Sequence, residues 1–269
     1  MLAPREVCAF RDALMDRPVT PDDIRRAKPE HRKLACLTAY DYPTARLLDE
    51  AGVDVILVGD SVGMVVLGHP DTTLVTMADM VHHTRIAARG VKRALVVADL
   101  PYHSYETPVQ ALENARRLMD EGAGAVKLEG GISRRPQIEA IVAAGIPLMA
   151  HIGMLPQNVR EEGGYKLKGR DEAGIISLIE DGHAVESAGA FSVVIEIVAR
   201  DAAQRITAAL GIPTIGIGSG EHCDGQILVT HDLIGLFPWF TPKFVRPEAQ
   251  VGTVIRDAVR RFVDRTHTG

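Results

Sequence analysis

Four carboxylates stand at or just after the ends of four apolar runs: Asp60, Asp99, Glu129 and Glu196. One such Asp alone would more often cap a turn or helix, but four at one place would repel one another and resist desolvation. A hard cation resolves that conflict, because Mg²⁺ takes oxygen ligands and leaves positions for substrate oxygens. The residues therefore predict a three-carboxylate magnesium site, provided that the apolar runs end at a common place.

Two further polar groups belong to the same pattern. Lys127 and Glu129 are two residues apart, so in a strand they face the same side. Lys127 could form an inward salt bridge that only holds structure, or meet an anionic substrate oxygen, and we favour the second interpretation. His151 ends another apolar run and could be a polar contact, a proton shuttle or a structural residue.

These residues need strands that bring them together. Short, continuous apolar runs are typical of strands that helices cover on both faces. Seven such runs lie at 34–39, 53–59, 94–98, 125–126, 146–150, 191–195 and 214–217. The segments between them begin with a capping residue and end with glycine, as from Thr76 to Gly90 and from Thr107 to Gly122. This alternation predicts parallel βαβ units and a single-domain (β/α)8 TIM barrel with the polar residues at one mouth.

The two ends of the chain are less regular. The eighth strand is expected at 232–236, followed by an irregular segment and a final helix from about 248 to 264. Residues 1–30 are predicted to be an N-terminal helical extension, with a short helix opening at Thr20-Pro21-Asp22, and residues 31–269 to be the catalytic barrel.

Composition excludes several classes of protein. The 269 residues are 46% hydrophobic but only 4% aromatic, which indicates a large aliphatic core, and the net charge of −5 does not suit a nucleic-acid partner. The three cysteines, Cys8, Cys36 and Cys223, form no CxxC pair or disulfide framework. No secretory signal and no run long enough to span a bilayer is present, so we expect no membrane partner and a cytoplasmic location.

Two glycine-rich segments have weak signals of their own. The segment 59–63 lacks the Gly-Lys-Ser/Thr of a Walker loop. The segment 216–220 resembles part of a dinucleotide fingerprint, but no acidic strand end follows at the usual spacing. It could serve tight packing, or its backbone N–H groups could face an anion after the seventh strand.

Taken in order, these motifs resemble those of the ketopantoate hydroxymethyltransferase (3-methyl-2-oxobutanoate hydroxymethyltransferase) family. The resemblance runs from about residue 34 to 246. It rests on the segments 38–42, 58–64, 97–101, 126–131, 151–153, 163–166, 216–220, 224–226 and 231–232. Two differences are peripheral: Ser219 stands where Ala is often expected, and the first thirty residues are longer than in some members.

The resemblance implies a role for each matching residue. Asp60 and Asp99 match the metal-site aspartates, and Glu129 matches the acidic residue beside the metal. Asp60, Asp99, Ser61 and Lys127 match the residues that hold the 2-oxo acid. Glu196 matches the proton acceptor. The implied reaction transfers a hydroxymethyl unit from 5,10-methylenetetrahydrofolate to 3-methyl-2-oxobutanoate through a Mg²⁺-stabilised enolate, giving 2-dehydropantoate for pantothenate synthesis. The implied assembly is a homo-oligomer, a decamer or octamer.

Two alternatives remain open at this point. A Mg²⁺-dependent carbon–carbon lyase or mutase of the phosphoenolpyruvate/isocitrate lyase type would also stabilise a 2-oxo acid enolate. Such enzymes often use a catalytic Cys in a mobile loop, whereas Cys223 lies late, in a different motif. A non-catalytic 2-oxo acid binder would have no need of both Lys127 and Glu196.

Overall fold

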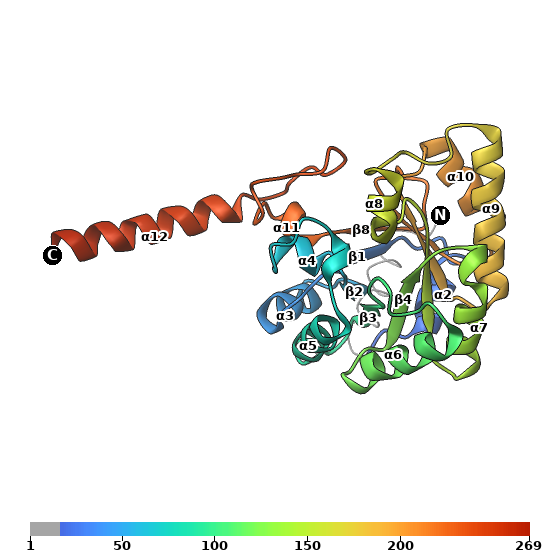
Figure 1. The fold of residues 1–269 in the computed structure, drawn as a ribbon. Helices are drawn as coiled ribbons and strands as arrows, with labels where there is room; N and C mark the ends of the chain where they lie inside the picture. Colours follow the sequence, from blue (N-terminus) through green and yellow to red (C-terminus); the bar gives the residue numbers. More distant parts are fainter. Residues whose placement is uncertain (1–16) are drawn as a thin grey trace. The chain divides into compact units, whose positions relative to one another are not determined.

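Eight strands form a closed barrel in the computed structural model, which describes residues 17–269 (Figure 1). The strands follow one another around the barrel in chain order, and each described pair from β1–β2 to β7–β8 is parallel. They are β1 (Leu34–Thr38), β2 (Val55–Val58), β3 (Leu95–Asp99), β4 (Ala125–Glu129), β5 (Leu148–Gly153), β6 (Ser192–Glu196), β7 (Thr214–Ile217) and β8 (Gly225–Leu228). The predicted (β/α)8 barrel is confirmed.

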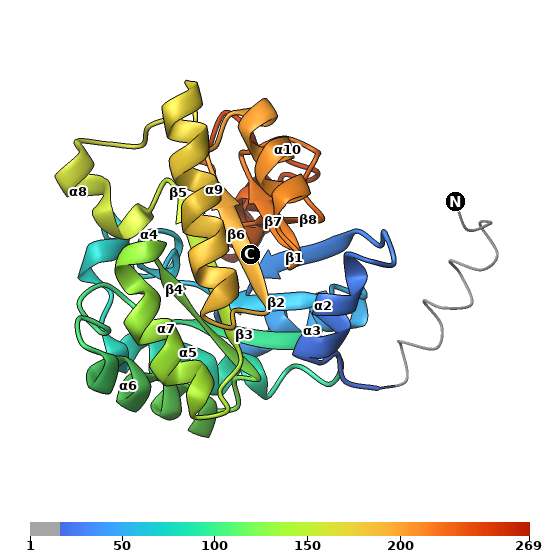
Figure 2. The same cartoon turned by 90° about the vertical axis from the view of Figure 1, so that its right-hand side faces the viewer.

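Helices surround the strands of the barrel (Figure 2). The longer ones are α3 (Tyr42–Glu50), α5 (Met77–Ala88), α6 (Pro108–Asp120), α7 (Arg135–Ala143), α9 (Glu172–Ser187) and α10 (Arg200–Ala209). Short helical turns in the connections are α4 (Val62–Val65), η1 (Thr72–Leu74), η2 (Ile132–Arg134), η3 (Pro156–Asn158) and α8 (Val159–Glu162). Helix starts agree with the capping residues in the sequence, since Thr76 and Asp79 form a reciprocal capping box and Thr107 accepts from the Gln110 N–H.

Two apolar layers hold the fold together. One fills the barrel interior and includes Val55, Val97 and Met149. The larger one lies between the strands and the outer helices, with Ile56, Leu128 and other aliphatic side chains at 0% exposure. Strands buried on both faces explain why the sequence showed continuous apolar runs instead of alternation.

The prediction of the eighth strand at 232–236 was wrong. The strand is β8, and the residues expected to form it belong partly to α11 (Thr230–Leu233). Gly225 opens β8 because a Cβ there would lie 2.8 Å from the Leu34 carbonyl oxygen, so only glycine allows this approach to β1. Gly225 and Gln226 interrupt the apolar pattern, which is why the strand escaped detection.

Helix α2 (Pro21–Ala27) closes the end of the barrel at which the strands begin. Ile24 and Ala27 are fully buried in the interior cluster together with Leu34, the first residue of β1. The predicted short helix is therefore confirmed; residues 1–16 lie outside the described residues, and the boundary of the extension at residue 30 stays a prediction.

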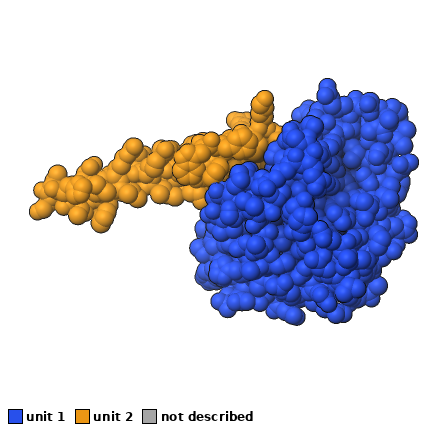
Figure 3. Space-filling model, in the orientation of Figure 1, with its two compact units in different colours: residues 1–227 blue, residues 228–269 orange. Residues whose placement is uncertain are grey.

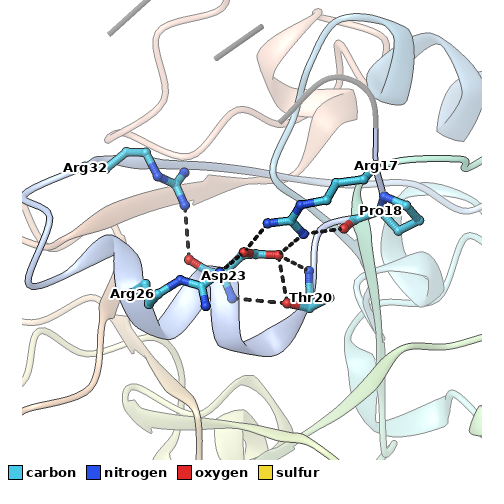
Figure 4. A network of polar contacts seen from close by, with 6 residues as sticks. All are labelled: Arg17, Pro18, Thr20, Asp23, Arg26 and Arg32. Carbon is cyan, nitrogen blue, oxygen red and sulfur yellow. Dashed lines mark hydrogen bonds and ion pairs between the residues drawn. The ribbon is translucent and has the colours of Figure 1, made fainter. Parts of the chain in front are cut away.

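The carboxylate of Asp23 holds the start of α2 through a network of polar contacts (Figure 4). It accepts two bonds of 2.7 Å from Arg17 and bonds of 2.9 and 2.7 Å from the backbone N–H and hydroxyl of Thr20. Arg26 adds a further ion pair. The Arg17 hydrogen bond outweighs the effect of burial and holds the pKa of Asp23 well below its usual range.

We expect Asp23→Asn to lower the free energy of unfolding by about 1–3 kcal/mol at pH 7, because Arg17, Arg26 and Thr20 lose a buried, charged acceptor. A depressed folded-state pKa stabilises the protein above the ordinary Asp value of 3.8, and this stabilisation is lost as pH falls below that value. The difference between variant and wild type should therefore shrink below about pH 4. Urea titrations check this, with the exposed neighbour as control: Asp22→Asn should cost less than about 1 kcal/mol.

The chain divides into two compact units, residues 1–227 and 228–269, coloured separately in Figure 3. The second unit holds α11 and the helix α12 (Val251–Thr268), which confirms a terminal helix. Across residues 17–269, no helix combines the length and apolarity needed to cross a membrane.

Candidate active site

The polar residues singled out in the sequence gather at the carboxyl end of the barrel. Asp99, Glu129 and Glu196 are the last residues of β3, β4 and β6. The register pairs Asp99 with Lys127, and Glu129 with His151 on β5. Because parallel strands end together at one mouth, side chains from distant parts of the sequence meet there.

An ion pair between Lys127 and Asp99 lies at the base of this site. Lys127 Nζ lies 2.9 Å from Asp99 Oδ1, and the two side chains are 4% and 3% exposed. The other oxygen, Asp99 Oδ2, accepts the backbone N–H of Asp60 at 3.1 Å. Gly59 leaves room for the Ser61 hydroxyl, because a Cβ there would lie 2.9 Å from Ser61 Oγ.

Negative charge dominates the buried group. Burial, and then the charges of Asp99 and Glu129, raise the pKa of Asp60 well above its usual range. Burial also raises the pKa of Asp99, although Lys127 opposes the effect. For Lys127, the attraction of the three carboxylates outweighs desolvation and raises the pKa above its ordinary value. The cluster therefore has a strong affinity for positive charge.

His151 links the buried acids to Glu196. Its Nδ1 lies 3.5 Å from Glu129 Oε1, and its Nε2 lies 3.2 Å from Glu196 Oε2. Burial and Lys127 lower the pKa of His151, but its bonds to Glu129 and Glu196 prevail and raise it to about 9. The Glu196 side chain is 12% exposed against 2% for Glu129, so Glu196 is the more accessible acid of this pair.

The backbone that carries Glu196 is fixed from several sides. Ile197 has a φ of 47°, a left-handed conformation that strains a β-branched residue. The Ser219 hydroxyl donates to the Ile195 carbonyl at 2.8 Å and accepts the Val198 N–H at 3.0 Å, bridging the strained residue. The Glu196 carbonyl accepts the Met154 N–H at 2.8 Å. These bonds hold Glu196 in one place at the mouth.

A hydroxyl pair lies beside Asp60. Ser61 Oγ is 2.8 Å from the hydroxyl of Tyr40, which is buried and follows β1 by two residues. One hydroxyl of such a pair can donate to the other, which leaves the second O–H free to donate to an acceptor oxygen.

Three residues of the site were not identified as functional from the sequence. Gln157 is 2% exposed; its side-chain N–H donates to Asp60 Oδ2 at 2.8 Å and its backbone N–H to Glu129 Oε2 at 3.1 Å. Tyr105 donates its hydroxyl to the Gln157 amide oxygen. Burial, followed by the charges of Glu196 and Asp60, raises the pKa of Tyr165, so this half-exposed residue lies within electrostatic reach of the acids. Tyr165 lies in a segment that carried the resemblance, which was its only signal.

The donor chemistry of the site suits a divalent cation. Within residues 17–269, no three or more His, Cys, Asp and Glu side chains are arranged as ready ligands for a metal ion. Mg²⁺ is, however, usually held by one or two carboxylates plus waters and substrate oxygens. Asp99 Oδ1 lies 2.9 Å from the Lys127 ammonium and accepts no other hydrogen bond from the described residues. Burial and the neighbouring acids disfavour the charged form of Asp60, as its raised pKa shows, and a bound cation would relieve this. Asp60 and Asp99 therefore fit as Mg²⁺ ligands with Glu129 beside them, and this assignment stays a prediction.

The glycine-rich segment after β7 is tightly packed. Ser219 is fully buried, and a Cβ on Gly216 would lie 3.0 Å from the Cys223 sulfur. Close packing thus accounts for Gly216, whereas Gly218 and Gly220 have φ angles of 63° and 83°, a left-handed conformation that favours glycine.

A parallel eight-stranded barrel with buried acids and a lysine at its carboxyl mouth defines an enzyme of the (β/α)8 class. The family model of ketopantoate hydroxymethyltransferase matches residues 18–269, and the chain belongs to this family.

Curated relatives agree over nearly the full length. A protein of Oleidesulfovibrio alaskensis named 3-methyl-2-oxobutanoate hydroxymethyltransferase is 53% identical, over 94% of this chain and 88% of the relative. A protein of the same name from Clostridium novyi is 52% identical, over 93% of this chain and 92% of the relative.

Solved structures share the fold at low identity. Phosphonopyruvate hydrolase superposes with a TM-score of 0.64 at 16% identity, covering 93% of this chain and 87% of that one. A 2,3-dimethylmalate lyase of the PEP mutase/isocitrate lyase superfamily gives 0.62 at 18% identity, covering 93% and 89%.

Proposed function

We propose that the chain transfers a hydroxymethyl unit from 5,10-methylenetetrahydrofolate to 3-methyl-2-oxobutanoate, forming 2-dehydropantoate in pantothenate synthesis. The observation that carries the proposal is the meeting of the Lys127–Asp99 ion pair with Glu196 at one mouth, in a chain of this family. A cation beside the bound acid and a separate carboxylate base are what enolate formation requires.

The 2-oxo acid would be held by charge and hydrogen bonding. Lys127 offsets the negative charge of the bound acid, and the Ser61 hydroxyl donates to its oxygens. Asp60 and Asp99 would hold Mg²⁺, which when bound supplies Lewis acidity that acidifies the methine hydrogen next to the ketone. The Lys127 ammonium remains charged in this buried place because the neighbouring carboxylates raise its pKa.

Glu196 is the base in this proposal. It removes the methine proton, and a positioned base of this kind typically accelerates the step by about a hundred- to ten-thousand-fold. His151, 3.2 Å away, orients the carboxylate. The strained backbone at Ile197 and the Ser219 bridge keep the base from turning away.

The product carbon restricts the order of steps. After the new bond forms, this carbon bears two methyl groups, the new carbon and the ketone, and no hydrogen. Tetrahydrofolate therefore cannot leave by elimination toward the ketone. We favour hydrolysis of the folate iminium to formaldehyde and tetrahydrofolate, followed by addition of the enolate to formaldehyde and protonation of the resulting alkoxide.

Product analysis tests the proposal directly. The chain is incubated with 3-methyl-2-oxobutanoate, methylenetetrahydrofolate and Mg²⁺, and 2-dehydropantoate is measured by mass spectrometry. Parallel incubations with phosphoenolpyruvate and isocitrate test the lyase and mutase activities. Product from either of these, with none from the first mixture, would overturn the proposal. Cys223 is fully buried, which argues against a catalytic loop cysteine at this position.

We further infer a homo-oligomer. Five apolar side chains of α12 are exposed by 37–64%: Val254, Ile255, Val259, Phe262 and Val263. Their spacing places them along one side of the helix, and an apolar face of this kind is typical of an association surface. The free, buried thiols of Cys36 and Cys223 agree with a reducing compartment, and we propose the cytoplasm.

We expect light scattering to give a mass that is a multiple of the chain mass, an octamer or decamer by resemblance. The double variant Val259→Glu and Phe262→Glu should lower the measured mass, because two charges would be desolvated in the contact between chains. The exposed Arg256→Glu on the same helix serves as the control and should leave the mass unchanged. An unchanged mass in the double variant would contradict the role of this face.

A further inference from the structure

A polar cavity of about 280 Å³ lies beside the acid cluster at the barrel mouth. Three segments line the cavity. The first is the loop between β3 and α6, with Tyr102, Tyr105 and Glu106. The second runs from the end of β4 to Arg134, and the third is the segment after β5 that contains Glu161. Neither Asp60, Asp99, Lys127 nor Glu196 is among the described lining residues. The cavity is therefore separate from the place where the 2-oxo acid is expected to bind.

The cavity nevertheless meets that place at two points. Glu129 lines the cavity and also lies 3.5 Å from His151 within the acid cluster. Tyr105 lines it and donates its hydroxyl to Gln157, whose side-chain N–H reaches Asp60 at 2.8 Å. A molecule in the cavity would thus have one end next to the reacting carbon, as a second substrate must.

The walls combine flat, cationic and acidic groups. The Arg134 guanidinium lies 5.2 Å from the centre of the buried Tyr105 ring. Glu161 accepts the Tyr102 hydroxyl at 3.2 Å, and the exposed Glu106 pairs with His103. Each carboxylate retains further acceptor capacity. Planar heterocycles stack on aromatic rings and guanidinium planes, and a ring edge with neighbouring N–H donors is bound by carboxylates.

We propose that this cavity binds the reduced pteridine ring of the one-carbon donor, stacked against Arg134, with its amino and ring N–H donors directed at Glu106 or Glu161. The inference rests on the proposed function and names the donor subsite. The volume is slightly below the range of about 300–1,000 Å³ for drug-sized ligand sites. It suits the bicyclic ring, while the benzoylglutamate part of the folate lies outside.

Two cavity variants and one control test the subsite. Arg134→Ala removes the stacking cation, and Ser133→Trp fills the cavity from its wall. The control is Arg135→Ala, the adjacent residue, which is not among the described lining residues and pairs with Glu139 on the exposed side of α7. Tetrahydrofolate binding is measured by equilibrium dialysis, KM is measured for methylenetetrahydrofolate and for the 2-oxo acid, and 6-methyltetrahydropterin is added as a competitor.

We expect both cavity variants to weaken tetrahydrofolate binding and raise the KM for methylenetetrahydrofolate at least about tenfold, with the KM for the 2-oxo acid within about twofold of wild type. Arg135→Ala should behave as wild type, and 6-methyltetrahydropterin should compete whereas p-aminobenzoylglutamate should not. Wild-type tetrahydrofolate affinity in both cavity variants would overturn the subsite. Failure of the proposed function shows separately, as a wild-type protein that forms no 2-dehydropantoate.

Discussion

Glu196→Gln should abolish removal of the substrate's methine proton while leaving the 2-oxo acid bound. Gln keeps the size of the side chain and can still meet His151, 3.2 Å away in the wild type, but it cannot accept a proton at neutral pH. Exchange of the methine hydrogen with deuterated water needs no folate, so it isolates this first step. With Mg²⁺ present, the variant should exchange at least about a hundred-fold more slowly than wild type.

Proton NMR of 3-methyl-2-oxobutanoate in deuterated water measures the exchange rate, and calorimetric titration measures binding. Glu172→Gln is a suitable control, because Glu172 is exposed and its ion pair with Arg205 lies between helices α9 and α10. Exchange at the wild-type rate in Glu196→Gln would make another group the base. His151 would then be the first candidate, because it is the buried ring that contacts both Glu129 and Glu196.

The strand ends explain why much of this site could be predicted from the sequence. A barrel turns the order of apolar runs into a ring, so any polar residue that ends a run is brought to the same mouth. Asp99, Glu129 and Glu196 each end a strand, and the two-residue period places Lys127 beside Glu129.

The residues that escaped prediction come from loops and irregular backbone. Gln157 lies in a 3₁₀ turn after β5, and its contacts with Asp60 and Glu129 depend on a loop path that no periodicity encodes. The left-handed Ile197 runs against local preference and is held by tertiary hydrogen bonds. β8 was misplaced for a related reason: its glycine is dictated by the neighbouring strand and not by the apolar pattern.

Asp99→Asn should separate metal binding from folding. Asn preserves the shape of the side chain and can still accept the Asp60 N–H. It removes one negative charge from a cluster of carboxylates that repel one another. Loss of the carboxylate that pairs with Lys127 destabilises the fold. Weaker repulsion with Asp60 and Glu129 offsets part of that cost. We therefore expect a folded protein by circular dichroism.

Mg²⁺-supported activity of Asp99→Asn should nevertheless fall at least about a hundred-fold, since both the cation and the orientation of Lys127 depend on the carboxylate. Mn²⁺ binding followed by electron paramagnetic resonance gives a readout independent of activity and should weaken at least about tenfold. Asp120→Asn, at the exposed end of α6, is the control and should bind Mn²⁺ as wild type does. Wild-type activity of Asp99→Asn in excess chelator would contradict a metal role for this site. That result would mean that Lys127 and His151 alone stabilise the remaining acids.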